Sequence, residues 1–182
     1  MDKQTLREHV STLKQDLPQK EKTAANKVIA AGVFAHPWVA AAKRVCVYIS
    51  LPDEVDTRRI IDAFFKAGKT VIVPKIVGDH LMLMPIDSWT DVRPGEFGIL
   101  EPVGSQFIHA SEVDVFLVPG VAFDAEGHRL GRGRGYYDKL LAKVHAPIIG
   151  LAYACQVVAQ VPVASYDVSV TDIITEKEIY AI

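Results

Sequence analysis

The chain has 182 residues and a formal net charge of −2, and 49% of its residues are hydrophobic and 23% charged. This composition is typical of a globular protein with a sizeable core and excludes a disordered chain. A net charge near zero does not favour a general nucleic-acid or membrane-surface binder, so we expect no nucleic-acid partner and no membrane partner. Positive charge is informative only where it is clustered.

The first forty residues have the apolar spacing of helices, and we expect them to pack on the rest of the chain. Asp2 is the expected N-cap of the first helix, and Pro18 opens a second helical run. The apolar stripe of the first helix consists of Leu6, Val10, Leu13 and Leu17. The stripe is the face that should be buried.

The cysteines and the N-terminal residues both bear on the compartment. Cys46 and Cys155 lie in apolar stretches with no second Cys or His at ligand spacing, so we expect buried thiols rather than a metal site, although the sequence does not exclude a disulfide. The N-terminus has no apolar leader region, and no apolar run reaches membrane-spanning length. These features predict a cytoplasmic protein.

From residue 44 onward, short apolar runs alternate with one strong helical pattern. Ile60, Ile61, Phe64 and Phe65 have helical spacing and lie between two strand-like runs, which makes a βαβ unit with parallel strands. The strand-like runs are 44–49, 70–74, 80–86, 113–120 and 146–154, with short strands expected after residue 172. The segment 87–110 is expected to be irregular. The sequence predicts one α/β domain over residues 1–182, with a mostly parallel sheet.

The segment RLGRGRGYYDK, residues 129–139, places three glycines among three arginines, directly before a helical run. Glycines permit positive φ and close approach of a ligand to the backbone, and arginines form paired hydrogen bonds to phosphate oxygens. The segment follows the strand-like run 113–120, and ligands of open α/β sheets bind beyond the carboxyl ends of strands. The positive end of the following helix would add to the attraction. We interpret the segment as a phosphate-binding loop.

Other phosphate- and RNA-binding motifs fit this segment less well. The loop lacks the Gly-Lys-Ser/Thr of a Walker A motif and the spacing of the dinucleotide fingerprint. An arginine–glycine tract can also bind RNA, but a single short copy between a strand and a helix does not favour this. The remaining alternative is a glycine-rich turn whose arginines are solvated.

Asp138 lies one turn into the helix, beside the expected phosphates. An unpaired carboxylate would repel phosphate there, and a bridging Mg²⁺ would remove the conflict, since this ion prefers hard oxygen ligands. An acidic residue in a first turn can equally serve the helix dipole. Both interpretations remain open at this point.

Four segments, in order and spacing, resemble the 5-formyltetrahydrofolate cyclo-ligase family. They are KQTLR (3–7), YISLPDEVDT (48–57), PGVAFDAEGHRLGRGRGYYDKLL (119–141) and VPVASYDVSVTDIITE (161–176). The resemblance covers essentially the whole chain, and the long third segment is the most specific. It implies a single three-layer α/β/α domain similar to the sugar-phosphate isomerase and CoA-transferase-like fold. We expect a monomer, although the sequence itself does not determine the oligomeric state.

The resemblance also implies site residues and cofactors. Mg²⁺ would be held by Asp138 and Asp167. Many members have an aspartate where this chain has Thr171, so Asp172 is an alternative to Asp167 as the second acid. Catalytic roles would fall to Lys3, Arg132 and Arg134. ATP would contact Lys3, Arg7, Arg129, Leu130, Gly131, Arg132, Gly133, Arg134, Gly135, Tyr136 and Tyr137. The folate would contact Ile49, Glu54 and the loop residues Arg132, Gly133, Arg134, Gly135 and Tyr136.

The implied reaction converts 5-formyltetrahydrofolate and ATP to 5,10-methenyltetrahydrofolate, ADP and phosphate. A formyl oxygen leaves poorly, so its phosphorylation must precede ring closure by N10, and phosphoryl transfer needs mainly positioning and charge neutralisation. Two other classes remain possible on the sequence. One is a phosphosugar isomerase or CoA-transferase-like enzyme of the same fold, and the other is a folate- or nucleotide-binding protein without turnover.

Overall fold

The computed structural model describes residues 1–95 and 98–182; residues 96–97, part of the segment expected to be irregular, lie outside the described residues. The α-helices are α1 (Lys3–Asp16), α2 (Gln19–Ala35), α3 (Pro37–Ala41), α4 (Arg58–Lys66) and α5 (Tyr136–Leu141). Short 3-10 turns occur at Trp89–Asp91, Ala110–Glu112 and Ala154–Gln156.

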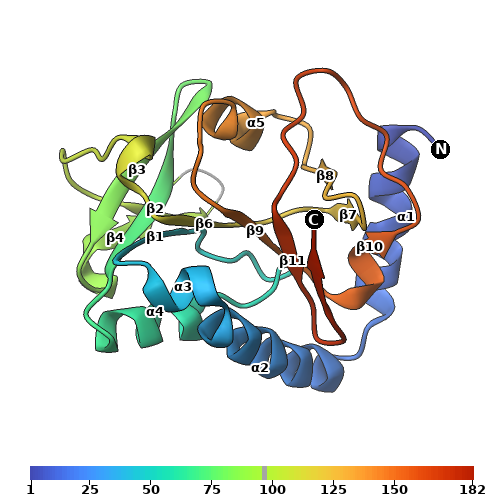
Figure 1. Ribbon diagram of the computed structural model, residues 1–182, viewed down its shortest axis with the longest axis horizontal. Helices are drawn as coiled ribbons and strands as arrows, with labels where there is room; N and C mark the ends of the chain where they lie inside the picture. The colour runs from blue at the N-terminus through green and yellow to red at the C-terminus, as the bar shows by residue number, and fades with distance from the viewer. Residues whose placement is uncertain (96–97) are drawn as a thin grey trace.

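A seven-stranded sheet forms the centre of the molecule, in the order β12-β11-β9-β6-β1-β2-β3 (Figure 1). The inner neighbours are parallel, and the edge strands β12 and β3 are antiparallel. Its strands are β1 (Arg44–Val47), β2 (Thr70–Val77), β3 (His80–Ile86), β6 (Val115–Val118), β9 (Ile148–Leu151), β11 (Asp172–Ile174) and β12 (Ile179–Ala181). The predicted α/β fold with a mostly parallel sheet is confirmed.

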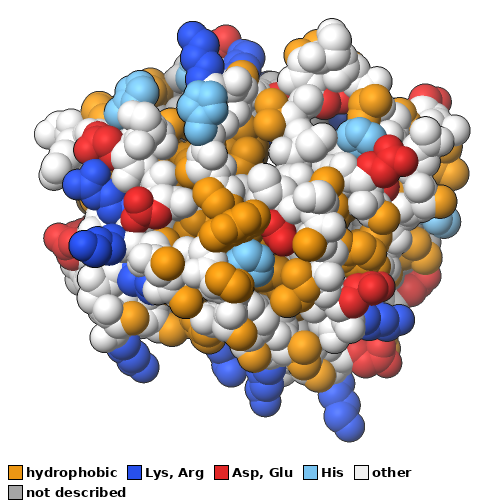
Figure 2. Space-filling model, viewed as in Figure 1, with side chains coloured by type: hydrophobic (Ala, Val, Ile, Leu, Met, Phe, Trp, Pro, Cys, Tyr) orange, Lys and Arg blue, Asp and Glu red, His pale blue; other side chains and the backbone are white. Residues whose placement is uncertain are grey.

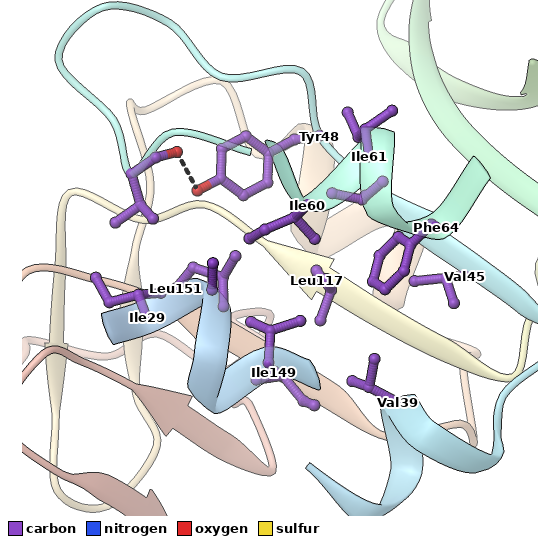
Figure 3. Packing of buried hydrophobic residues seen from close by; sticks show 14 of the residues in the cluster. Ile29, Val39, Val45, Tyr48, Ile60, Ile61, Phe64, Leu117, Ile149 and Leu151 are labelled. Atoms are coloured by element: carbon purple, nitrogen blue, oxygen red, sulfur yellow. Dashed lines mark hydrogen bonds between the residues drawn. The ribbon is translucent and has the colours of Figure 1, made fainter. Parts of the chain in front are cut away.

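Hydrophobic side chains cover both faces of this sheet. Successive residues of β1 alternate, so that Val45 and Val47 join one buried cluster and Cys46 joins another. Helices α2, α3 and α4 lie on the first side and α5 on the other (Figure 1). Figure 3 shows Ile29 of α2 and Phe64 of α4 pointing into the first cluster. The sheet is therefore the middle of three layers, with one hydrophobic cluster on each of its faces.

Helix α1 is the element whose buried face differs most from its sequence pattern. The side chain of Asp2 accepts hydrogen bonds from the amides of Gln4 and Thr5, which confirms the predicted cap. Leu6 and Val10 are buried as expected, but Leu13 is 37% exposed. Lys14 takes the next buried position instead. A cation therefore occupies a place that the apolar pattern assigned to its neighbour.

Two short ladders were missed by the sequence patterns. Strands β7 (Ala122–Asp124), β8 (Arg129–Leu130) and β10 (Val157–Val158) form a three-stranded sheet against α1. Strands β4 (Val92–Pro94) and β5 (Leu100–Pro102) pair within the segment expected to be irregular. The glycine–arginine loop therefore leaves β8, and not the carboxyl end of β6 directly, which corrects the expected connection.

Neither cysteine forms a disulfide; Cys46 is buried as expected, whereas Cys155 is only partly buried. In the described part of the chain, no helix combines the length and the apolar character that crossing a membrane requires. Figure 2 shows Lys and Arg side chains projecting from the lower rim of the molecule, where α2 and α4 lie in Figure 1.

Candidate active site

A cavity of about 580 Å³ opens at the carboxyl ends of the parallel strands, where ligands of such sheets bind. One part of its wall is apolar and comes from the ends of β1, β2 and β6 and from β3 and β5. The opposite part is the glycine–arginine loop with the start of α5. The apolar part consists of Tyr48, Ile49, Leu51, Pro74, Ile76, Leu81, Ile99, Leu100, Pro119 and Val121. The charged part includes Glu54, Arg129, Arg132, Arg134 and Asp138.

The glycine–arginine loop has the backbone geometry that its glycines predict. Gly133 has φ 99° and Gly135 has φ 66°, where it caps α5. The Nε of Arg7 donates to the carbonyl oxygen of Gly131 at 2.9 Å. A Cβ atom built on Gly133 would lie 3.6 Å from the guanidinium of Arg7. The first helix is thereby brought to this loop, as expected for Arg7.

Helix α5 is shorter than the sequence suggested. It has only six residues, so its dipole adds little to the attraction for an anion. The side chains of the loop and its glycine backbone must therefore provide that attraction. Tyr136 lines the cavity, whereas Tyr137 also packs against the second buried cluster, and burial raises the pKa of the Tyr137 phenol well above its usual range.

Arg129 and Leu130 differ from what the loop sequence suggested. The side chain of Arg129 is only 2% exposed, and its Nη2 donates to Oδ1 of Asp138 at 2.8 Å. Its Nε is buried without a partner among the described residues. The Leu130 side chain is buried beside α1, so only its backbone is available for a ligand. We conclude that Arg129 primarily fixes Asp138 and is secondarily an edge of the cavity.

Asp138 receives two hydrogen bonds on the same oxygen, one from Arg129 and one from the amide of Val168 at 3.2 Å. Its other oxygen, Oδ2, has no partner in the ranges that the structure describes, and the side chain lines the cavity. This arrangement leaves one carboxylate oxygen for a cation. The helix-dipole interpretation does not account for the buried arginine that holds it.

Asp167 lies next to the ion pair of Arg129 and Asp138, since the amide of the following residue, Val168, donates to Asp138; Asp172 does not lie there. Lys3 donates to Oδ2 of Asp167, and the amide of Ala164 donates to the same atom at 2.7 Å. Burial alone would raise the pKa of Asp167, but these two hydrogen bonds lower it. Asp172 is buried 3.5 Å from His36 at the far end of the sheet order from the cavity strands. Of the two alternatives, the geometry favours Asp167.

The side chain of Thr57 holds the loop after β1. Its hydroxyl donates to the carbonyl of Tyr48 at 2.6 Å and accepts from the amide of Ser50 at 3.0 Å, so it closes the loop rather than capping α4. Within the loop, Oε2 of Glu54 accepts from the amide of Leu51 at 2.9 Å. Glu54 and Ile49, for which the resemblance implies folate contacts, both line the cavity.

Arg132 links the two parts of the wall. Its Nη2 lies 2.8 and 3.0 Å from the carboxylate oxygens of Asp53 and 3.2 Å from Oε1 of Glu54. Arg132, the residue expected to bind phosphate, thus directly contacts Glu54, the residue expected to bind the folate. Arg134 lines the same cavity, and no ion pair of Arg134 occurs among the described residues.

These residues suit a magnesium nucleotide. Arg7, Arg132 and Arg134 supply guanidinium groups around a loop with positive φ, and Asp138 presents a free carboxylate oxygen. In residues 1–95 and 98–182, no group of three or more His, Cys, Asp or Glu side chains forms a cage for a metal ion. An ion held by one or two carboxylates and by substrate phosphates is how proteins usually bind Mg²⁺.

A second, more polar cavity of about 340 Å³ adjoins the first and shares Leu51 and Glu54 with it. Lysine and arginine side chains of α2 and α4 surround it. Sequence reasoning did not identify this cavity, nor the apolar wall from β2, β3 and β5, nor the contacts of Lys14 and Asp53. Pro74 ends the strand-like run 70–74 expected from the sequence, and this was a signal for that wall, although β2 itself continues to Val77.

The comparisons with known proteins agree with this geometry. Residues 1–176 match the 5-formyltetrahydrofolate cyclo-ligase family. The mouse 5-formyltetrahydrofolate cyclo-ligase is 29% identical in an alignment that covers 96% of this chain and 93% of the mouse protein. The Escherichia coli K12 protein of the same name is 27% identical, over 90% of this chain and 94% of that protein.

Solved structures are also similar over the whole chain. The 5,10-methenyltetrahydrofolate synthetase of Aquifex aeolicus superimposes with a TM-score of 0.90 at 34% identity, covering 100% of this chain and 93% of that one. A synthetase from Mycoplasma pneumoniae, 24% identical, shares the fold with a TM-score of 0.79, over 97% of this chain and 99% of that one. The family match, the relatives and the cavity all lead to one conclusion. The chain belongs to the 5-formyltetrahydrofolate cyclo-ligase family of ligases.

Proposed function

We propose that this protein converts 5-formyltetrahydrofolate to 5,10-methenyltetrahydrofolate, consuming ATP in the presence of Mg²⁺. The observation that carries the proposal is the shared cavity, in which Glu54 of the loop after β1 and Arg132 and Arg134 of the glycine–arginine loop line one space. A phosphoryl donor and its acceptor must meet in such a space. Family membership supports the folate substrate.

The apolar part of the wall suits a flat aromatic ring, and Glu54 gives it one polar edge. Its side chain is 11% exposed, so its hydrogen bonds form largely out of water. A carboxylate accepts paired hydrogen bonds from an amino group and a neighbouring ring N–H, which the pterin presents. Pro74, Ile76 and Leu81 would then cover the ring and exclude water.

The proposed chemistry begins with transfer of the γ-phosphoryl group to the formyl oxygen of the substrate. N10 then attacks the activated carbon, the carbon–oxygen bond breaks, and phosphate leaves together with the proton that N10 gives up. Arg132, Arg134 and Arg7 neutralise charge on the phosphoryl oxygens, and the backbone of Gly133 permits their close approach. Mg²⁺ would supply further charge neutralisation at the phosphates, beside Asp138. Lys3 holds Asp167 next to this position.

The proposal predicts turnover that requires both ATP and a divalent ion. Purified protein is mixed with 5-formyltetrahydrofolate, ATP and Mg²⁺, and the methenyl chromophore is followed by absorbance. Omission of ATP or addition of a chelator should remove the signal, because the γ-phosphoryl group is consumed. Binding of folate without turnover would indicate a binding protein. Turnover of a phosphosugar or a CoA ester, with no methenyl product, would indicate one of the other enzymes of this fold.

Glu54→Gln should raise KM for 5-formyltetrahydrofolate by about ten- to a hundredfold, the cost of about 1.5–3 kcal/mol for a charge-assisted hydrogen bond. In glutamine, one of the two oxygens that accept hydrogen bonds from the pterin is replaced by an NH₂ group, which then faces a pterin N–H donor. KM for ATP should change much less, because Asp53 still holds Arg132. Initial rates with each substrate varied in turn give the two constants. A shift confined to the ATP constant would show that the two ligands are assigned to the wrong ends of the cavity.

A further inference from the structure

Lys14 is a charged residue in a position where an apolar one was expected. It lies on the buried face of α1 and its side chain is only 6% exposed. Its Nζ donates to the carbonyl oxygen of Asp53 at 2.9 Å and to Oδ2 of the same residue at 3.0 Å. A buried ammonium is costly unless it is paired and hydrogen-bonded, so these bonds hold α1 to the loop after β1.

Asp53 passes this restraint to the glycine–arginine loop. Each of its carboxylate oxygens lies within 3.0 Å of Nη2 of Arg132, and the same nitrogen contacts Glu54. Partial burial alone would raise the pKa of Asp53, but Lys14 and Arg132 lower it. The Nε and Nη1 of Arg132 make no hydrogen bond within the described residues, so the guanidinium retains donors for another anion.

The contact between Asp53 and Arg132 differs from an ordinary surface ion pair. Such a pair contributes little to stability, because solvent screens it and two long side chains must be ordered. Arg132 and Asp53 are each about half exposed, but Lys14 anchors Asp53 from inside. The three residues belong to α1, to the loop after β1 and to the loop after β8. Their mutual arrangement therefore fixes two cavity loops relative to one another.

We propose that Asp53 is a positioning residue, which holds the guanidinium of Arg132 at the edge of the cavity beside Glu54, while Lys14 holds Asp53. The proposal rests on the proposed function in one respect, the role of Arg132 at the phosphates. Without Asp53, only the 3.2 Å contact with Glu54 would restrain Arg132, so the guanidinium would sample more rotamers and each phosphate contact would first have to order it. The cost would appear in the use of ATP rather than in the fold.

A double-mutant cycle in the full chain tests this proposal. Asp53→Asn should lower kcat/KM for ATP by about tenfold, a size common for coupled neighbours, with KM for 5-formyltetrahydrofolate changed less than about twofold. Arg132→Gln should cost more. In the Arg132→Gln background, Asp53→Asn should add almost nothing, because there is no guanidinium left to position. Glu112→Gln, which removes an exposed partner of Arg44 at the other end of β1, is the matched control and should leave both constants unchanged.

Additive losses in the cycle, or a wild-type kcat/KM for ATP in Asp53→Asn, would overturn the proposal. If Asp53→Asn lowers the melting temperature strongly, Lys14→Met provides the second variant. Lys14→Met keeps an unbranched side chain in the buried position and leaves Asp53 and Arg132 intact. It should also reduce kcat/KM for ATP, by a smaller factor than Asp53→Asn. An unchanged kcat/KM for ATP in this variant would count against the proposal. Failure of wild-type turnover would refute the proposed function, and an additive cycle with active wild type would refute only the role of Asp53.

Discussion

Gly133→Val should reduce kcat/KM for ATP by about a hundredfold or more, the effect expected when reacting groups are displaced by about 1 Å. Gly133 has φ 99°, which a β-branched residue does not readily adopt. The space beside it is adequate, since a Cβ atom would meet Arg7 only at 3.6 Å. The loss should therefore come from a changed loop backbone and from blocked approach of the phosphates. Steady-state rates and the melting temperature of the same preparation check both parts.

Gly68→Val is the matched control for this change. Gly68 also has a positive φ, at 69°, and no atom lies within 4 Å of its added Cβ position. It follows α4 and does not line the cavity, so the variant should show a similar loss of stability with wild-type kinetics. Full activity of a folded Gly133→Val variant would mean that the loop does not bind phosphate through its backbone.

Asp138→Asn should lower kcat/KM for ATP by about a hundredfold and raise the half-saturating Mg²⁺ concentration by at least about tenfold, since even indirect partners of a metal ligand typically cost that much affinity. The amide keeps the shape but removes the negative charge that the free Oδ2 presents. The buried guanidinium of Arg129 also loses its counter-ion, and a charged hydrogen bond contributes about 1.5–3 kcal/mol to stability. Rates measured across a Mg²⁺ titration, with a parallel thermal melt, separate the two effects.

Asp79→Asn provides the comparison for Asp138→Asn. Asp79 is an exposed acid between β2 and β3 that pairs at 2.8 Å with Lys139 of α5, the helix that carries Asp138. Its replacement therefore changes a charge near α5 without affecting the cavity lining. Its Mg²⁺ titration should match that of the wild type. If Asp138→Asn is destabilised but has an unchanged Mg²⁺ dependence, Asp138 serves only as the partner of Arg129.

The fold was predictable where the periodicity of the sequence is set by burial. The runs at 44–49 and 113–120 are apolar on both faces because helices or loops cover both sides of β1 and β6. Strands β4, β5, β7 and β8 are only two or three residues long, which is too short for an alternation to be recognised. Pairing with distant segments, rather than local preference, forms them.

The site was predictable to the level of loops but not of contacts. Glycine and arginine content predicted a binding loop at 129–135, and this loop and Glu54 line one cavity. No local pattern could show that Arg129 turns inward to Asp138 or that Lys14 replaces Leu13 on the buried face. Those choices depend on partners nine and 39 residues away. Charge pairing in three dimensions decides them.

The way α1 is attached has a consequence for local opening of the chain. The helix buries few apolar side chains, and its further attachments are the contacts of Lys3, Arg7 and Lys14 with three separate segments. Such an element is expected to detach with a free energy below that of global unfolding, as one cooperative unit. Any ligand that engages Arg7 would bind only the attached state and would shift that equilibrium by mass action. Amide hydrogen exchange along Lys3–Asp16 should consequently slow when nucleotide is added, even at amides that the nucleotide does not touch.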